Sequence, residues 1–185
     1  MTVKYGLIAE DNSDIKVIKV LAKKVSGRNI TSAQFVGKGC GAIRRKAPGW
    51  CKAFHEKGCT QILLVHDRDR SDAAKLQAEL EEILKDAPQP KRVVVVPSEE
   101  IEAWLLSDQG AIKTALNMRQ AFKEVHHPET VKSPKEHLGD LVWKASGKKI
   151  TYVNSVHNPL IAELADIKSI SKKCPSFKPF EKFFE

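Results

Sequence analysis

The sequence has no long apolar segment, which argues against a protein that crosses a membrane as helices. None of its apolar runs approaches the roughly 20 residues that a membrane-spanning helix needs. The N-terminal residues also lack the basic and then apolar pattern of a secretory signal peptide. We therefore expect a cytoplasmic protein with no membrane partner. Its composition, 42% hydrophobic and 29% charged, is typical of a globular protein.

Several common motifs are also missing. The four cysteines, Cys40, Cys51, Cys59 and Cys174, form no C-x-x-C pair, and a cytoplasmic chain of 185 residues does not need disulfides, so we expect free thiols. The six histidines form no H-E-x-x-H motif. No Walker loop is present, so any dependence on ATP would require a separate ATPase subunit.

The charge is unbalanced toward the basic side. The net charge is +8, which favours a polyanionic partner such as nucleic acid. Residues 1–109 carry 18 Lys and Arg against 15 Asp and Glu, whereas residues 110–185 carry 13 against 8. The C-terminal part is thus the more basic one, either to hold a nucleic-acid strand or as an ordinary solvated surface.

Two carboxylates follow the apolar run at residues 61–65, and they are the first candidates for a functional site. A short run of this composition predicts a buried strand, and alternate residues of a strand point to the same side. We therefore expect Asp67 and Asp69 to face the same side. Two such charges repel each other unless a cation neutralises them, and oxygen ligands favour Mg²⁺ or Mn²⁺. The alternative is a solvated turn that precedes a helix.

Alternation of apolar strands and helical periodicity predicts an α/β fold. Strands are expected near residues 4–10, 30–36, 61–66 and 91–97, with helices between them. This order predicts a four-stranded, mostly parallel sheet sandwiched by helices over residues 1–108. Residues 109–185 are expected to form a helical C-terminal appendage packed on it, with helices near 111–125, 133–143 and 159–167 and a docked aromatic tail.

Three more glutamates are expected near Asp67 and Asp69. Glu10 ends the first strand, and Glu99 and Glu102 follow the fourth. The carboxyl ends of parallel strands meet at one edge of a sheet, so these side chains should lie close together. If a helix begins after the fourth strand, Glu99 and Glu102 share one of its faces. A helix dipole also favours acidic residues at this position, which is the structural alternative.

The segment Gly37–Lys46 combines three glycines with four cations. Glycine allows the backbone to approach a phosphate closely, and the cations supply the opposite charge. The segment is either a basic loop near the site or a flexible connector.

The order of these motifs resembles the Toprim domain of topoisomerases, bacterial primases and nucleases of the overcoming-lysogenization-defect type. The resemblance depends on Glu10 after Leu7–Ala9 and on the Asp67-x-Asp69 pair two strands later. Glu100–Leu106, Pro134–Lys135 and the Ser176–Phe177 tail are similar to a family of small standalone Toprim-like bacterial proteins, long catalogued as a domain of unknown function.

The resemblance implies metal-dependent hydrolysis of phosphodiester bonds in DNA or RNA, with a role in antiphage defence. It implies that Asp67 and Asp69 bind Mg²⁺ or Mn²⁺, that Glu99 or Glu102 extends the coordination, and that Glu10 binds metal or acts as general acid or base. The cations that it places on substrate phosphates are Lys38, Arg44, Arg45, Arg68 and Arg70.

Two other functions remain open from the sequence. The chain could be a non-catalytic module that binds nucleic acid or an ATPase partner, with the carboxylates as a regulatory metal site. It could also be an α/β scaffold whose acidic corner holds no metal.

Overall fold

The computed structural model describes residues 3–37, 40–120 and 122–185. Four parallel strands form one sheet in the order β2-β1-β3-β4. The α/β prediction is therefore confirmed, and every strand pair is parallel. The strands are β1 (Lys4–Ala9), β2 (Thr31–Val36), β3 (Gln61–Val65) and β4 (Lys91–Val95).

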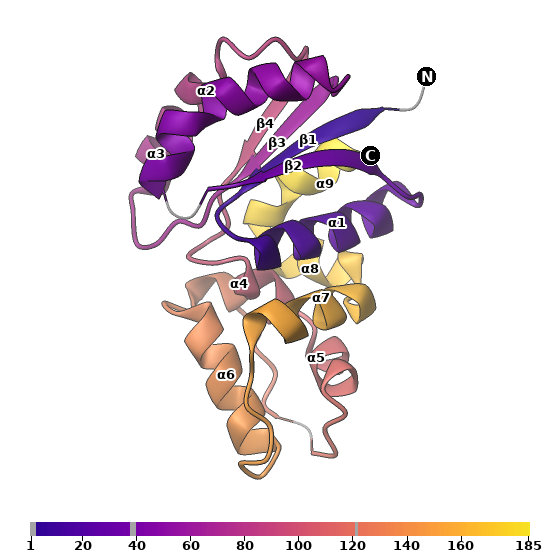
Figure 1. Ribbon diagram of the computed structural model, residues 1–185. Coiled ribbons are helices and arrows are strands. Elements are labelled where there is room, and N and C mark those ends of the chain that lie inside the picture. Colours follow the sequence, from indigo (N-terminus) through magenta and orange to yellow (C-terminus); the bar gives the residue numbers. More distant parts are fainter. Residues whose placement is uncertain (1–2, 38–39, 121) are drawn as a thin grey trace.

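Helices cover both faces of this sheet (Figure 1). Alternate residues of the central strands point to opposite faces, so Leu7 and Leu63 pack on one side while Ile8 and Leu64 pack on the other. The first side is covered by α1 (Asn12–Ser26) and α9 (Lys178–Phe184), and the second by α2 (Cys40–Glu56) and α3 (Ala73–Leu84).

The C-terminal part is helical, as predicted. It contains α5 (Gln109–Ala115), α6 (Pro134–Ala145), α7 (Asn154–Leu164) and α8 (Ile167–Lys173), with 3-10 helices η1 (Pro128–Thr130) and η2 (Pro175–Phe177). The short α4 (Glu102–Leu105) joins it to the sheet. Among the described residues, no helix is long and apolar enough to cross a membrane.

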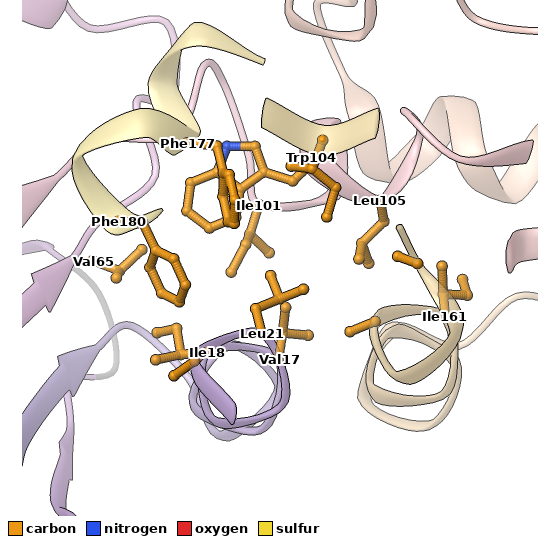
Figure 2. Packing of buried hydrophobic residues seen from close by; sticks show 14 of the residues in the cluster. Val17, Ile18, Leu21, Val65, Ile101, Trp104, Leu105, Ile161, Phe177 and Phe180 are labelled. Carbon is orange, nitrogen blue, oxygen red and sulfur yellow. The ribbon is translucent and has the colours of Figure 1, made fainter. Parts of the chain in front are cut away.

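One hydrophobic cluster continues through both parts of the chain (Figure 2). Ile18 and Leu21 of α1 contribute to the same cluster as Trp104 of α4 and Phe177 and Phe180 near the C-terminus. Trp104 lies 5.1 Å from Phe177 and 5.6 Å from Phe180, measured between ring centroids. The aromatic tail therefore docks, as predicted, and the division after residue 108 stays a prediction.

Two predicted segments differ from the structure. The basic segment after Gly37 is helix from Cys40 onward, so Arg44 and Arg45 lie on α2 and not on a loop. Its helical register is set by Ile43, Ala47, Cys51 and Phe54, which are buried on the sheet despite Pro48 inside the helix. The helix predicted for 111–125 ends at Ala115.

The cysteines behave as predicted where the structure describes them. Cys51, Cys59 and Cys174 are free and buried. Burial raises the pKa of Cys51 to about 11 and that of Cys174 to about 12, so both remain protonated thiols at neutral pH.

Candidate functional site

The candidate site lies at the carboxyl ends of β1 and β3. The chain leaves β1 toward β2 on one side and later returns to β3 on the other side. This reversal of strand order is the position at which open α/β sheets bind their ligands. Glu10 follows β1 directly, and Asp67 follows β3 after one intervening residue, His66.

Asp67 is at the centre of the site. Its Oδ1 accepts a hydrogen bond of 3.0 Å from the backbone N–H of Ile101, which fixes the carboxyl group beside α4. Burial raises the pKa of Asp67 well above its ordinary value, and nearby negative charges raise it further. These charges belong, in decreasing order of effect, to Asp14, Glu102, Glu10 and Asp69.

Asp14 joins the site from the first turn of α1. Asp11 caps this helix by accepting a 3.0 Å hydrogen bond from Asp14 N, while Asp14 Oδ2 accepts a 3.2 Å bond from Asp11 N. Burial and then the charge of Asp11 raise the pKa of Asp14 from 3.8 to about 7. The charge coupling of Asp14 to Asp67 was not predicted from the sequence.

Glu102 comes from the start of α4 and is held by the C-terminal part. Its Oε1 accepts a 2.9 Å hydrogen bond from Asn158 Nδ2, and Tyr152 bonds Asn158 Oδ1 in turn. Burial raises the pKa of Glu102, and the bond from Asn158 opposes this shift. The same burial, together with the charge of Glu102, raises the pKa of Tyr152, which stays a phenol. Neither Asn158 nor Tyr152 was predicted from the sequence.

Glu10 contacts a buried histidine. Its Oε1 lies 3.0 Å from His66 Nδ1, which also lies 2.6 Å from the carbonyl oxygen of Asp67. Strand alternation predicts that His66 points away from Asp67 and packs in the core. The ring is buried, and it also contacts Glu10, because the parallel register of β1 and β3 pairs Ile8 with Leu64 and so, two residues on, brings Glu10 beside His66.

Asp69 lies in a tight turn and not on the strand. Asp69 and Arg70 have left-handed backbones, with φ of 48° and 62°. Asp69 is exposed at the rim of the site; partial desolvation and the charge of Glu10 raise its pKa, while His66 opposes the shift. The turn therefore keeps Asp69 coupled to Asp67, although not through the strand geometry that the sequence suggested.

Glu99 holds this turn. Its backbone is left-handed, with φ of 64°, and it lies outside α4. The prediction that Glu99 and Glu102 share a helix face is therefore wrong. Its Oε1 pairs with Arg68, its Oε2 accepts a 2.8 Å bond from Arg70 N, and its carbonyl accepts a 2.9 Å bond from Arg68 N. Both carboxylate oxygens of Glu99 are thus engaged by the turn.

The five predicted phosphate-binding cations are not gathered in one place. Arg68 and Arg70 lie in the turn beside Asp69, and Arg70 Nη2 reaches Ser133 Oγ at 3.4 Å. Arg44 instead pairs with Glu79 of α3 at 2.6 Å, and Arg45 is exposed on α2. Lys38 lies outside the described residues.

The site has the ligand chemistry of a hard divalent cation. Five of its side chains, those of Glu10, Asp14, Asp67, Asp69 and Glu102, offer carboxylate oxygens, which suit Mg²⁺ and Mn²⁺. In the part of the chain that the structure describes, no three Asp, Glu, His or Cys residues are arranged to hold a metal ion. Mg²⁺ often uses only one or two carboxylates and takes its other oxygens from water and substrate phosphate, so the residues fit this mode of binding.

The comparisons with known proteins place the chain in a family but assign no activity. No curated protein and no solved structure matches it. One family model, described as a domain of unknown function (DUF4276), matches residues 10–185. Because this match covers nearly the whole chain, the protein belongs to the DUF4276 family.

Proposed function

We propose that the protein is a Mg²⁺- or Mn²⁺-dependent phosphodiesterase that hydrolyses DNA or RNA. The observation that carries the proposal is the gathering of Asp67 with four other carboxylates at the switch point of a parallel sheet, where burial and their charges raise the pKa of Asp67. A protein gains no stability from gathering such charges, and perturbed carboxyl groups of this kind cluster at functional sites. The net charge of +8 supports a polyanionic substrate.

A divalent cation explains why the charges are gathered. When bound, it would neutralise the carboxylates, polarise a substrate phosphate and lower the pKa of a water molecule. We assign Asp67 as one ligand and either Asp69 or Glu102 as the second, with water and substrate phosphate supplying the remaining oxygens. Ile101 N orients Asp67, and Asn158 orients Glu102.

Glu10 is the residue that we assign to proton transfer. It is partly exposed at the end of β1, and its Oε1 lies 3.0 Å from His66 Nδ1. A carboxylate beside an imidazole can accept a proton from the attacking water and return it. Glu99, whose oxygens are engaged by Arg68 and Arg70 N, keeps the turn in shape instead of binding metal.

The wider assignment follows from the same site. A glutamate after the first strand and an Asp-x-Asp pair after the third are the features that resemble Toprim domains, and this supports phosphodiester chemistry. We extend the proposal to a cytoplasmic enzyme of antiphage defence, by the same resemblance.

Isothermal calorimetry with Mg²⁺ and Mn²⁺, joined to a cleavage assay on mixed DNA and RNA, tests this function. We expect the wild-type chain to bind metal and cleave. Asp67→Asn should lose at least about 100-fold in rate. It should also unfold at a higher temperature than wild type in EDTA at pH 8, because an uncharged side chain replaces a desolvated charge.

The exposed Asp140 of α6 provides the control, since Asp140→Asn makes the same chemical change away from the site. It should bind metal and cleave as the wild type does. Metal binding without cleavage would instead support a non-catalytic module that binds nucleic acid or a separate ATPase subunit. Absence of metal binding would refute the proposal.

A further inference from the structure

We propose that a cavity beside the carboxylates binds the backbone of single-stranded nucleic acid, next to the phosphodiester that is cleaved. This inference rests on the proposed function and names its substrate class. The cavity has a volume of about 540 Å³ and lies between the 68–70 turn and the 129–132 segment. The residues that line it are Arg68, Arg70, Glu99, Glu129, Thr130, Val131 and Lys132.

Arg68 pairs with Glu99, and both carboxylates of the cavity accept hydrogen bonds, so the cations that remain for a phosphate are Arg70 and Lys132. Glu99 is bonded by Arg68 and by Arg70 N, and Glu129 Oε1 accepts a 2.9 Å hydrogen bond from Ser176 N. Arg70 and Lys132 are exposed and belong to two different segments of the wall. A phosphate between these segments would therefore meet positive charge from both sides.

The cavity begins where the carboxylate cluster ends. Asp69 of the cluster lies between Arg68 and Arg70 in the chain, and consecutive Cα atoms are about 3.8 Å apart. A phosphate held at Arg70 would therefore lie beside the carboxylates to which we assign the metal ion. The turn that Glu99 holds fixes this spacing, because the backbone N–H groups of Arg68 and Arg70 both bond Glu99.

The size and lining of the cavity favour a single strand. Its volume is within the range of about 300–1,000 Å³ that is typical of small-ligand pockets, so it can take a nucleotide or two but no duplex. None of the described residues that line it is aromatic, so bases find no ring there to stack on. We therefore expect binding that depends on the backbone charge, with little preference for sequence.

Fluorescence anisotropy in EDTA tests the cavity separately from hydrolysis. The probes are labelled oligonucleotides of about 12 nucleotides, as single-stranded DNA, single-stranded RNA and duplex DNA. The test variant is Arg70→Gln with Lys132→Gln. The control is Lys52→Gln with Lys178→Gln, which removes the same charge from exposed positions on α2 and α9.

Wild-type protein should bind at least one single strand more tightly than the duplex. Each lost phosphate contact should reduce the slope of log K against log salt by about 0.7, and so weaken binding about fivefold at 0.1 M salt. The test variant should therefore bind about 25-fold more weakly than wild type, with a slope smaller by about 1.4. The control variant should lose much less binding affinity than the test variant.

Three results would overturn the inference: tighter binding of the duplex, equal losses in the test and control variants, or no single-strand binding by the wild type. Failure of the proposed function would give a different set of results from failure of the cavity proposal. If Mg²⁺ supports no cleavage but the test variant alone loses binding, the nuclease proposal falls and the cavity remains a nucleic-acid site. If the wild type cleaves and the test variant binds and cleaves equally well, only the cavity proposal falls.

Discussion

At the scale of single residues, Asp14 makes stability depend on pH. Its folded-state pKa is about 7, against 3.8 for the ordinary carboxyl. The folded chain therefore binds this proton more tightly than the unfolded chain, so the contribution of Asp14 to stability is fully present at low pH and is lost as pH rises from about 4 to about 7. A difference of this size corresponds to about 4 kcal/mol for a single site.

We expect the free energy of unfolding, measured by urea titration in EDTA, to fall between pH 4 and pH 8. Asp14→Asn should flatten this dependence and be the more stable protein at pH 8. Asparagine can still accept the bond from Asp11 N, so the helix cap is retained. Asp140→Asn, at an exposed position, should leave the dependence unchanged. An equal fall in wild type and Asp14→Asn would contradict the assignment.

The residues at the site divide into those that a sequence can predict and those that it cannot. Glu10 and Asp67 were predictable because parallel strands bring their carboxyl ends to one edge. Asp14 was not, because it lies in the first turn of α1 and not at the end of a strand. Asn158 was not, because its contact with Glu102 spans 56 positions and depends on how α7 packs. Glu99 was misplaced because its left-handed backbone cannot be derived from periodicity.

At the scale of elements, Gly6 allows α2 to approach the sheet closely. A Cβ at this position would lie 2.5 Å from Phe54 Cδ2, far inside van der Waals contact. We expect Gly6→Ala to lower the free energy of unfolding by about 1–3 kcal/mol, because β1 or α2 must shift.

Gly49 of α2 provides the matched control for Gly6. A Cβ there meets no atom within 4 Å, so Gly49→Ala should raise stability by up to about 1 kcal/mol through helix propensity. Denaturant titration of the two variants measures both effects. A neutral Gly6→Ala would mean that Phe54 can rotate away without cost.

Element boundaries were less predictable than element types. The pattern Ile43, Ala47, Cys51 and Phe54 has helical spacing, but glycines and Pro48 gave a stronger local signal for a loop. Burial of this stripe against the sheet outweighs that local signal. The segment after Ala115 shows the opposite error. Its sequence is compatible with a helix, but α5 ends at Ala115.

At the scale of the whole molecule, the C-terminal tail completes the core. Phe180 lies 5.1 Å from Phe177 and 4.9 Å from Phe184, and it packs on Trp104 of α4. We expect Phe180→Ala to cost about 3–5 kcal/mol. Because one cluster joins the sheet to the tail, the loss should appear as a single earlier transition.

The exposed Lys178 in the same helix is the control, and Lys178→Ala should unfold as wild type does. Circular dichroism at far- and near-ultraviolet wavelengths distinguishes the outcomes. Two separated transitions in Phe180→Ala would show that the sheet and the C-terminal helices are independent units.

The overall architecture was predictable because strands and helices alternate regularly up to residue 97. That alternation determines the parallel sheet, and its apolar strands require helices on both faces. The packing of the C-terminal helices on this sheet was not predictable. The apolar periodicity between residues 109 and 185 is weak, so it does not indicate which face of each helix is buried or against which element. The docked tail was the exception, since its four phenylalanines had to be buried somewhere.

The position of α9 has a consequence for synthesis on the ribosome. Phe183 and Phe184 cover Tyr5 of the first strand, and Lys91 Nζ of the last strand bonds Phe183 O. The sheet is translated once Val95 is added, yet one of its faces is covered only by α1 until α9 is complete at residue 184. At ordinary elongation rates this delay is roughly 4–18 s. The nascent chain should therefore be a client of ribosome-associated chaperones until α9 has left the ribosome.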